Sequence, residues 1–273
     1  MTTFFLPLGV KSKWEDNELR YLLRSLETNF TDEFKVVIYA QKKPDWLINV
    51  ECLEIPRYYP DNALRLNRGV KAYENYFDTL NKLKTFVYSE SCDGGFVYIY
   101  DDILLIKKID AWGILNYPQN VFNDKHFIHN LSSKHGRTIN TAFNTSGSKY
   151  NFETHLPKYY YAENMRTMFE KYPFDKLNIP YAIATTYFGL YLFQATLPPL
   201  QEKNDYKAGF EGFSGRVGVY PQDIIEQINE AVEGKTWVNY NDVGLWWNTE
   251  KYNGFLLQDW IKNKFPNKSK FEI

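Results

Sequence analysis

The sequence predicts an α/β fold: a Rossmann-type, open mixed sheet flanked by helices, with a helical elaboration toward the C-terminus. Apolar, β-rich runs end in loops and are followed by segments in which leucines recur at helical spacing. The strongest run, residues 96–100, ends abruptly in Asp101 and Asp102. The 273 residues include only two cysteines, and a chain of this length buries enough surface to fold without disulfides.

The first part of the chain reads as a strand, a loop and a helix. Residues 3–8 are apolar and end at Gly9, and residues 14–18 are an acidic stretch typical of a helix start. The expected helix carries an apolar face of four leucines: Leu19, Leu22, Leu23 and Leu26. Further strands are expected at residues 34–39 and 50–55.

The Asp pair lies between two apolar runs in the middle of the chain. Residues 62–90 are mostly helical in propensity, and a glycine pair separates them from the strand 96–100. The apolar character resumes at residues 103–106. We therefore place Asp101 and Asp102 at the carboxyl end of a central strand, the edge at which open α/β sheets bind ligands.

The second half of the chain carries weaker signals. We expect a strand at residues 126–130 and a long surface loop at 131–149, which is rich in Ser, Asn, Gly and Thr. Helices are expected at residues 162–172, at residues 181–195 and from Pro221, followed by a strand near residues 236–240 and a last helix near residues 255–264. With no repeat or linker, we expect a single domain spanning residues 1–273.

Composition and charge argue against several classes of protein. Lys and Arg number 32 against 33 Asp and Glu, so the molecule lacks the field that would attract nucleic acid or anionic lipid. Residues 1–10 lack the basic start of a signal peptide, and the apolar stretch 181–195 is shorter than the roughly 20 residues that span a bilayer. Cys52 and Cys92 do not have zinc-site spacing. We expect a cytoplasmic protein without a transmembrane segment.

Two adjacent carboxylates raise each other's pKa unless a cation neutralises them. Mg²⁺ or Mn²⁺ prefers oxygen ligands and commonly binds one or two carboxylates together with substrate phosphates. A metal site at Asp101 and Asp102 that anchors a diphosphate-bearing substrate explains the pair. A solvated acidic turn explains it equally well from these two residues alone.

Four short blocks resemble known families. The order of an apolar strand, an Asp-Asp element and a resumed apolar strand resembles the metal motif of GT-A-fold, nucleotide-sugar glycosyltransferases. More specifically, the chain is similar to the Stealth-type transferases of exopolysaccharide assembly, which move a hexose 1-phosphate. The blocks are DNELRY with LRSL and KPDWL (residues 16–47), YIYDD (98–102), THLP (154–157) and FPNKSKFE (265–272).

The resemblance implies a GT-A-like domain with a nucleotide-binding half, residues 1–110, and an acceptor-side half, residues 111–273. It implies transfer of a sugar from a nucleotide diphosphate sugar to a hydroxyl acceptor in glycan or capsular polysaccharide synthesis, with Mn²⁺ or Mg²⁺. Tyr100 stands where the Stealth pattern has Asn, and residues 4–9 lack its acids. Hexose 1-phosphate transfer is therefore the alternative, and a non-catalytic glycan-binding protein is the second.

On that scaffold, the loop that follows the first strand faces the nucleotide. Gly9 and Lys11 would contact phosphate or base. Arg20 would bind a phosphate bidentately together with Arg24, or these arginines would pair with Glu27 or Asp16 on a surface helix.

The remaining candidates surround the metal. Asp102 is the expected ligand, Asp101 supports the ribose or the metal's waters, and His155 completes the metal shell or acts as an acid. Glu153 and Asp242 are candidate bases for an inverting enzyme. Residues 202–220 have a glycine-rich composition suited to a mobile lid that would bring Lys207 and Arg216 over the diphosphate. Ordinary flexibility accounts for the same glycines.

Overall fold

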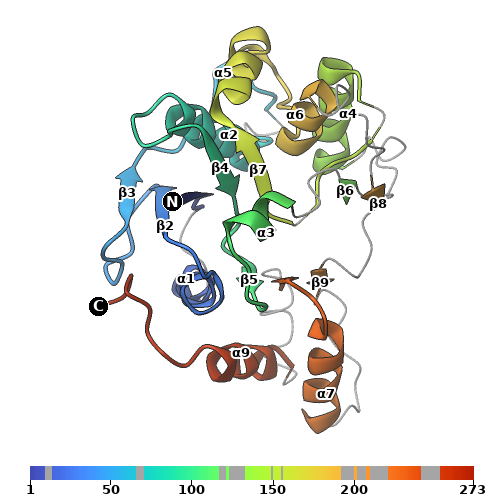
Figure 1. Ribbon diagram of the computed structural model, residues 1–273. Coiled ribbons are helices and arrows are strands. Elements are labelled where there is room, and N and C mark those ends of the chain that lie inside the picture. The colour runs from blue at the N-terminus through green and yellow to red at the C-terminus, as the bar shows by residue number, and fades with distance from the viewer. Residues whose placement is uncertain are drawn as a thin grey trace.

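The computed structural model describes residues 1–9, 14–65, 71–116, 121–122, 133–148, 150–154, 156–191, 200–201, 207–209, 221–240 and 253–273. Within these residues the main sheet has five strands in the order β3-β2-β1-β4-β7. Their bounds are β1 (Thr2–Pro7), β2 (Phe34–Ala40), β3 (Glu51–Glu54), β4 (Gly95–Tyr98) and β7 (Lys158–Tyr161). The first four run parallel, and β7 pairs antiparallel with β4. This arrangement, visible in Figure 1, confirms the predicted α/β class and the open mixed sheet.

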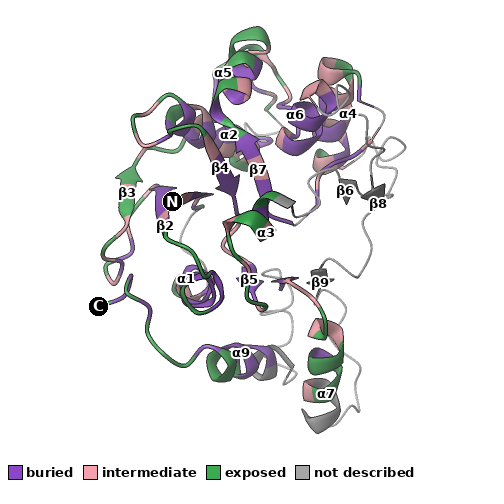
Figure 2. Ribbon diagram, viewed as in Figure 1, coloured by how far each residue is buried: buried purple, intermediate pink, exposed green. Residues whose placement is uncertain are grey.

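The central strands are apolar without interruption because both faces of the sheet are covered. In β1, Phe4 and Leu6 belong to one hydrophobic cluster and Phe5 to another on the opposite face. The same alternation divides Val36 from Val37 in β2. Figure 2 shows β4 as largely buried, whereas β7, at the edge of the sheet, alternates between buried and more exposed residues.

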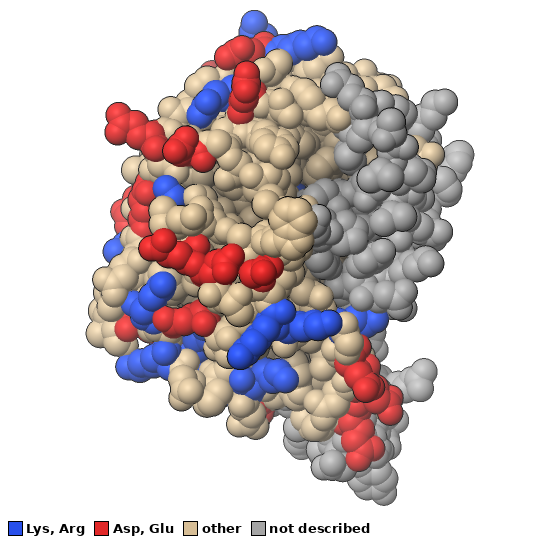
Figure 3. All heavy atoms as spheres, viewed as in Figure 1, with Lys and Arg blue, Asp and Glu red and all other residues tan. Residues whose placement is uncertain are grey.

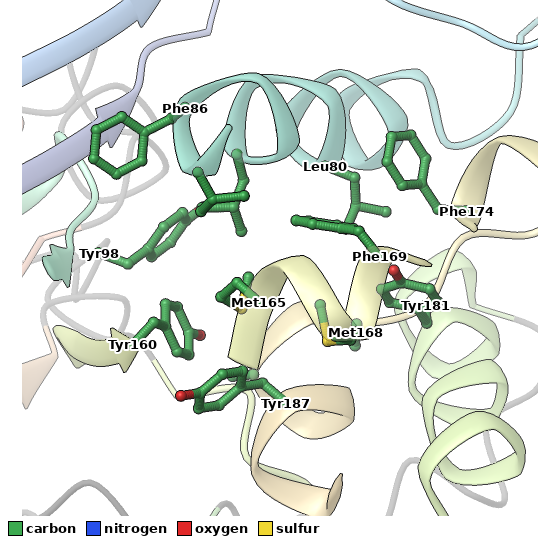
Figure 4. Close-up of a cluster of buried hydrophobic side chains, with 14 of the residues drawn as sticks. Leu80, Phe86, Tyr98, Tyr160, Met165, Met168, Phe169, Phe174, Tyr181 and Tyr187 are labelled. Carbon is green, nitrogen blue, oxygen red and sulfur yellow. The ribbon is translucent and has the colours of Figure 1, made fainter. Parts of the chain in front are cut away.

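Four helices cover the Phe5 face of the sheet: α2 (Glu74–Val87), α4 (Lys134–Ser146), α5 (Ala162–Lys171) and α6 (Ile183–Tyr191). Figure 4 shows Phe86 and Leu80 on α2 and Met165 on α5, with Tyr98 and Tyr160 reaching the same cluster from β4 and β7. Phe5 stacks on Phe86 with ring centroids 4.1 Å apart. This layer fixes one face of the sheet against the helices.

The opposite face is covered by α1 (Asn17–Asn29) and the short α3 (Ala111–Asn116). The four leucines of α1 are fully buried against the sheet, as their spacing predicts. Helix α1 connects two adjacent parallel strands, β1 and β2. The start of α1 therefore lies near the carboxyl ends of the strands.

A second, three-stranded sheet carries the C-terminal elaboration: β5 (Ile103–Leu105), β10 (Trp237–Asn239) and β9 (Lys207–Gly209). Strand β10 is antiparallel to β5 and parallel to β9. Helices α7 (Pro221–Val232) and α9 (Asn253–Lys264) pack against it through a third cluster that includes Ile228, Val238 and Ile261. The remaining elements are β6 (Val121–Phe122), β8 (Leu200–Gln201) and a 3-10 turn (Phe174–Lys176).

The prediction of a long loop at residues 131–149 is wrong, because α4 occupies Lys134–Ser146. The Ser133 hydroxyl caps the helix by accepting a hydrogen bond from Gly136 N–H at 2.9 Å. The Thr141 hydroxyl donates to the Arg137 carbonyl of the preceding turn at 3.0 Å. Ile139 and Ala142 are fully buried, so tertiary packing outweighs a polar composition that favours loops.

Three other expectations fall partly or wholly outside the described residues. Within residues 62–90, the described helix is α2 alone, and residues 66–70 lie outside the described part of the chain. In the expected lid, Lys207–Gly209 form strand β9, and residues 202–206 and 210–220 lie outside the described residues. The expected strand at 126–130 also lies outside the described residues. Among the described helices, none has the length and apolarity needed to cross a bilayer.

Candidate functional site

The topology places a switch point of the sheet at the carboxyl ends of β1 and β4. Strand β1 pairs with β2 on one side and with β4 on the other, so the strand order reverses direction at β1. Ligands bind outside the carboxyl ends of parallel strands at such a switch point. Phe5 is in register with Tyr98, so Gly9 follows one strand and Asp101 follows its neighbour at the same edge.

Asp101 and Asp102 occupy the turn between β4 and β5, where the chain leaves the main sheet for the second one. Tyr240 N–H donates to the Asp102 carbonyl at 3.1 Å, and Asn239 Nδ2 donates to the same oxygen at 3.2 Å. The Tyr240 hydroxyl donates to the Asp101 carbonyl at 3.3 Å. Both residues are half-buried, and Asp102 Oδ1 is buried. The main chain of the pair is thus held from β10.

A pocket of about 290 Å³ lies beside this edge, where β1 and β2 end and α1 begins. Its lining comes from three short stretches of chain: Leu8 and Gly9, Glu15 to Asn17 with Arg20, and Gln41 to Trp46. A Cβ placed on Gly9 would meet no atom within 4 Å. Glu15 and Asp16 have φ values of 58° and 60°, a left-handed conformation that costs energy outside glycine and clusters at functional sites.

The charges of the described lining residues balance. Arg20, Lys42 and Lys43 contribute cations, and Glu15, Asp16 and Asp45 contribute carboxylates. Figure 3 shows the same mixture of acidic and basic side chains over one face of the molecule, in keeping with its net charge of −1. The described part of the lining is therefore polar but close to neutral in charge.

Arg20 lines the pocket and is fixed from three sides. Its Nε donates to Asn17 Oδ1 at 3.1 Å and its Nη1 to Glu272 Oε2 at 2.9 Å. Its guanidinium lies 4.2 Å from the centre of the Trp46 ring. The expected ion-pair partners of Arg20 and Arg24, Glu27 or Asp16, are replaced by Glu272, a residue that helical spacing within α1 could not indicate.

Arg24 binds the same carboxylate in a bidentate pair, with Nε to Oε1 and Nη2 to Oε2 both at 2.7 Å. Burial by itself would raise the pKa of Glu272, but hydrogen bonds from Arg24, from the Ser269 N–H and from Arg20 lower that pKa to about 2. The Glu272 hydrogen bond in turn raises the pKa of Arg24. Glu272 is therefore a buried anion that joins two cations of α1.

A second buried ion pair supports the end of β1. Lys82 on α2 is 1% exposed, and its Nζ donates to Asp78 Oδ2 at 2.6 Å and to the Leu8 carbonyl at 2.7 Å. Asp78 also accepts from the Tyr58 N–H at 3.0 Å. This pair ties α2 to the residue that precedes Gly9.

Glu153 lies near the end of β4 on the α4 and α6 side. Its Oε1 accepts from the Thr185 N–H at 2.9 Å. Burial, followed by other charges that include Glu153, raises the pKa of Tyr98 and Tyr100 above the usual range. Burial and the charge of Glu153 raise the pKa of Tyr76 to about 12. The phenols around Glu153 are therefore neutral hydrogen-bonding groups at physiological pH.

The structure brings some of the expected residues to one edge. Gly9 and Arg20 line the pocket, and Asp101 and Asp102 follow the neighbouring strand. Lys207 lies in β9, with its backbone paired to Trp237, and nothing is described of its side chain. Lys11, His155, Arg216 and Asp242 lie outside the described residues.

The donor set fits a hard divalent cation, because Asp101 and Asp102 are adjacent carboxylates at the edge where ligands bind open α/β sheets. Among the described residues, no group of three or more His, Cys, Asp or Glu side chains is placed to hold a metal ion. Two carboxylates still suffice for Mg²⁺ or Mn²⁺ when substrate phosphates supply further ligands.

Sequence reasoning did not single out several residues around the pocket: Lys42, Lys43, Trp46, Asp78, Lys82 and Glu272. A signal was present for some of them. Lys42 lies three residues after the strand predicted at 34–39, and Lys43, Trp46 and Glu272 belong to blocks that carry the family resemblance. No sequence signal indicated Lys82, because its burial depends on the packing of α2 against β1.

No known protein family matches this sequence, and no curated protein matches it. Two solved structures are similar in outline. One is the galactosyltransferase LgtC in complex with donor and acceptor sugar analogues, at 12% identity, with a TM-score of 0.48 and 98% of each chain covered. The other is an active-site mutant of LgtC, at 13% identity, with a TM-score of 0.48 and the same coverage. A likeness at this level carries no inference about the chemistry of the site.

Proposed function

We propose that this protein is a metal-dependent glycosyltransferase that moves a sugar from a nucleotide diphosphate sugar to a hydroxyl acceptor. One observation carries the proposal. The Asp101–Asp102 pair and the pocket beside Gly9 lie at the same edge of the sheet, at the carboxyl ends of neighbouring parallel strands. A ligand with a nucleoside at one end and a diphosphate at the other suits a pocket next to two carboxylates.

In this proposal the nucleoside occupies the pocket and the diphosphate extends toward Asp101 and Asp102. Gly9 gives the ligand close access to the backbone, since its α-carbon faces open space. Lys82 fixes the Leu8 carbonyl and so the start of the loop that carries Gly9 and Lys11. A bound Mg²⁺ or Mn²⁺ would stabilise the negative charge of the departing nucleoside diphosphate.

The acceptor side is proposed on the β7 flank of the Asp pair. Strand β7 begins at Lys158 opposite Tyr98, so the chain before it approaches the carboxyl end of β4, which supports a role for His155. Glu153 is the candidate base on this flank if the enzyme inverts the anomeric centre. Tyr240 contacts both aspartates and precedes Asp242 by two residues, which supports Asp242 as a further candidate.

Stealth-type transfer of a hexose 1-phosphate is the second candidate function. One contact in the structure supports it. The first and last blocks that resemble that family meet directly, through Arg20 and Arg24 on Glu272. A role in capsule or other exopolysaccharide assembly would accompany either activity. The products separate them, because sugar 1-phosphate transfer releases a nucleoside monophosphate and forms a phosphodiester.

The test is a screen of nucleotide sugars, with and without Mn²⁺, for thermal stabilisation and then for turnover. Binding of the true donor raises the melting temperature by mass action. Asp102→Ala should lower turnover on the order of 100-fold or more, as expected when charge stabilisation is removed from a transition state. Asp93→Ala is the matched control, since Asp93 is exposed near the amino end of the same strand.

Two results would count against the proposal. Turnover that survives Asp102→Ala would remove the Asp pair from the chemistry. A protein that binds glycans but shows no metal-dependent response to any nucleotide sugar would be the non-catalytic glycan-binding protein instead.

A further inference from the structure

Residues 265–273 follow α9 and run past α1 to the loop before β3, as Figure 1 shows. We call this stretch the 265–273 segment. It pairs with the loop that carries Trp46: Ile48 N–H donates to the Phe271 carbonyl at 2.9 Å, and Ile273 N–H donates to the Trp46 carbonyl at 3.1 Å. Leu47 and Glu272 form an antiparallel bridge between these hydrogen bonds. The segment thus supports one wall of the pocket from behind.

Glu272 connects this segment to the pocket through one side chain. It is 6% exposed and does not line the pocket, yet its Oε2 accepts from Arg20 Nη1 at 2.9 Å. The Glu272 carboxylate is itself fixed by Arg24 and by the Ser269 N–H, the latter at 2.9 Å. Its position is therefore determined independently of Arg20.

These contacts give the Arg20 guanidinium a defined plane. Asn17 and Glu272 use only its Nε and Nη1 donors, and the Trp46 ring lies 4.2 Å from its central carbon. A guanidinium is flat and stacks on aromatic rings, unlike an ammonium group. Arg20 and Trp46 together present a flat, cationic surface at the pocket.

The balance of charge in the pocket indicates which part of a ligand this surface takes. Among the described lining residues, Glu15, Asp16 and Asp45 offset the three cations, so this part of the pocket offers a diphosphate little net attraction. A planar, uncharged ring can stack on the guanidinium, and its N–H groups can donate hydrogen bonds to the carboxylates of the lining. The base of a nucleotide has these properties.

We propose that Glu272 is a positioning residue that fixes Arg20 against Trp46, so that the guanidinium forms a platform for the base of a bound nucleotide. This inference rests on the proposed function for the identity of the ligand. Glu272 acts on the base through Arg20 and contributes nothing to affinity by itself.

The test is a double-mutant cycle on nucleotide affinity in the full chain. UDP, GDP, ADP and CDP are titrated with Mg²⁺ by calorimetry, and the tightest binder is kept as the probe. Glu272→Gln and Arg20→Ala should each weaken the probe about tenfold, within the range expected for loss of one base-stacking contact. The double variant should be no weaker than Arg20→Ala alone. In turnover, KM should rise while kcat stays near the wild-type value.

Two controls separate positioning from general destabilisation. Glu27 accepts from Lys270 N–H at 2.7 Å, so Glu27→Ala loses one contact with the same segment without touching Arg20, and the probe affinity should not change. Pyrophosphate carries no base, so its affinity should be the same in all variants. Melting curves fix a temperature at which every variant is folded.

Several results would overturn the inference. Additive losses in the double variant would mean that Glu272 does not act through Arg20. If Arg20→Ala weakens pyrophosphate binding as much as nucleotide binding, Arg20 is a phosphate ligand. Unchanged nucleotide affinity in Glu272→Gln would sink the positioning role alone, whereas a wild-type protein that binds none of the four nucleotides would sink the proposed function as well.

Discussion

The Asp101–Asp102 pair and the pocket beside Gly9 lie at the same edge of the main sheet, but they are held in place by different kinds of contact. The aspartates come three and four residues after the end of β4, and the contacts from Asn239 and Tyr240 reach their main-chain carbonyls. The pocket depends on charged side chains from distant parts of the chain, with Glu272 on Arg20 and Lys82 on the Leu8 carbonyl. The region of Asp101 and Asp102 should therefore keep its structure when one contacting side chain is removed. The pocket should be disrupted when one ion-pair partner is removed.

The largest effect is expected at Lys82. Lys82→Met removes the cation and leaves Asp78 as an unpaired buried charge, which should lower the free energy of unfolding by about 3–5 kcal/mol. Chemical denaturation measures this loss. Lys84→Met is the control, because Lys84 lies on the same helix with a distant, half-exposed partner, and its change should stay within about 0.5 kcal/mol. A Lys82→Met loss below about 1 kcal/mol would mean that the pocket side is no more dependent on ion pairs than the Asp side.

The second effect is a pH dependence that comes from Glu272. Its folded-state pKa, about 2, lies below the ordinary value of 4.5, so it contributes stability that is fully present above pH 4.5 and is lost as the pH falls toward 2. The contribution at neutral pH is on the order of 3 kcal/mol. Unfolding of wild type and Glu272→Gln is compared from pH 7 down to the acid limit of the fold.

The two proteins should differ most at neutral pH and converge as Glu272 becomes protonated. A difference that stays constant down to pH 3 would show that Glu272 stabilises the fold by packing and not by charge. The pocket would then be held in the same way as the aspartates.

The same contrast explains what could be predicted from the sequence. The Asp pair was placed correctly at a strand end because an apolar run and the residues after it are local signals. The pairing of Arg20 with Glu272 spans almost the whole chain, so helical spacing led instead to Glu27 or Asp16. Helix α4 was missed because Ile139 and Ala142 become apolar anchors only when the helix packs on α6 and the sheet.

A smaller effect is expected at Tyr240, on the Asp side of the comparison. Tyr240→Phe removes hydroxyl bonds to the carbonyls of Asp101 at 3.3 Å and Glu18 at 3.4 Å, and leaves the Tyr240 N–H on Asp102. We expect a loss of about 1 kcal/mol in unfolding free energy and donor turnover near the wild-type value. Tyr161→Phe, at an exposed position of β7, is the control. A collapse of turnover in Tyr240→Phe at unchanged stability would show that the aspartates also depend on a single side chain.

The smallest effect on stability is expected at Gly9. Substitutions there test whether the ligand uses the space inside the pocket, because they leave the contacts around the pocket unchanged. A side chain at Gly9 meets no atom within 4 Å, and its backbone is outside the left-handed region, so Gly9→Ala and Gly9→Val should change the unfolding free energy by no more than about 0.5 kcal/mol. The added atoms nevertheless occupy the space proposed for the ligand. Calorimetric affinity for a nucleoside diphosphate should therefore fall modestly for Ala and steeply for Val. Equal affinity in Gly9→Val and wild type would show that the nucleotide does not enter this pocket, whatever Glu272 does to Arg20.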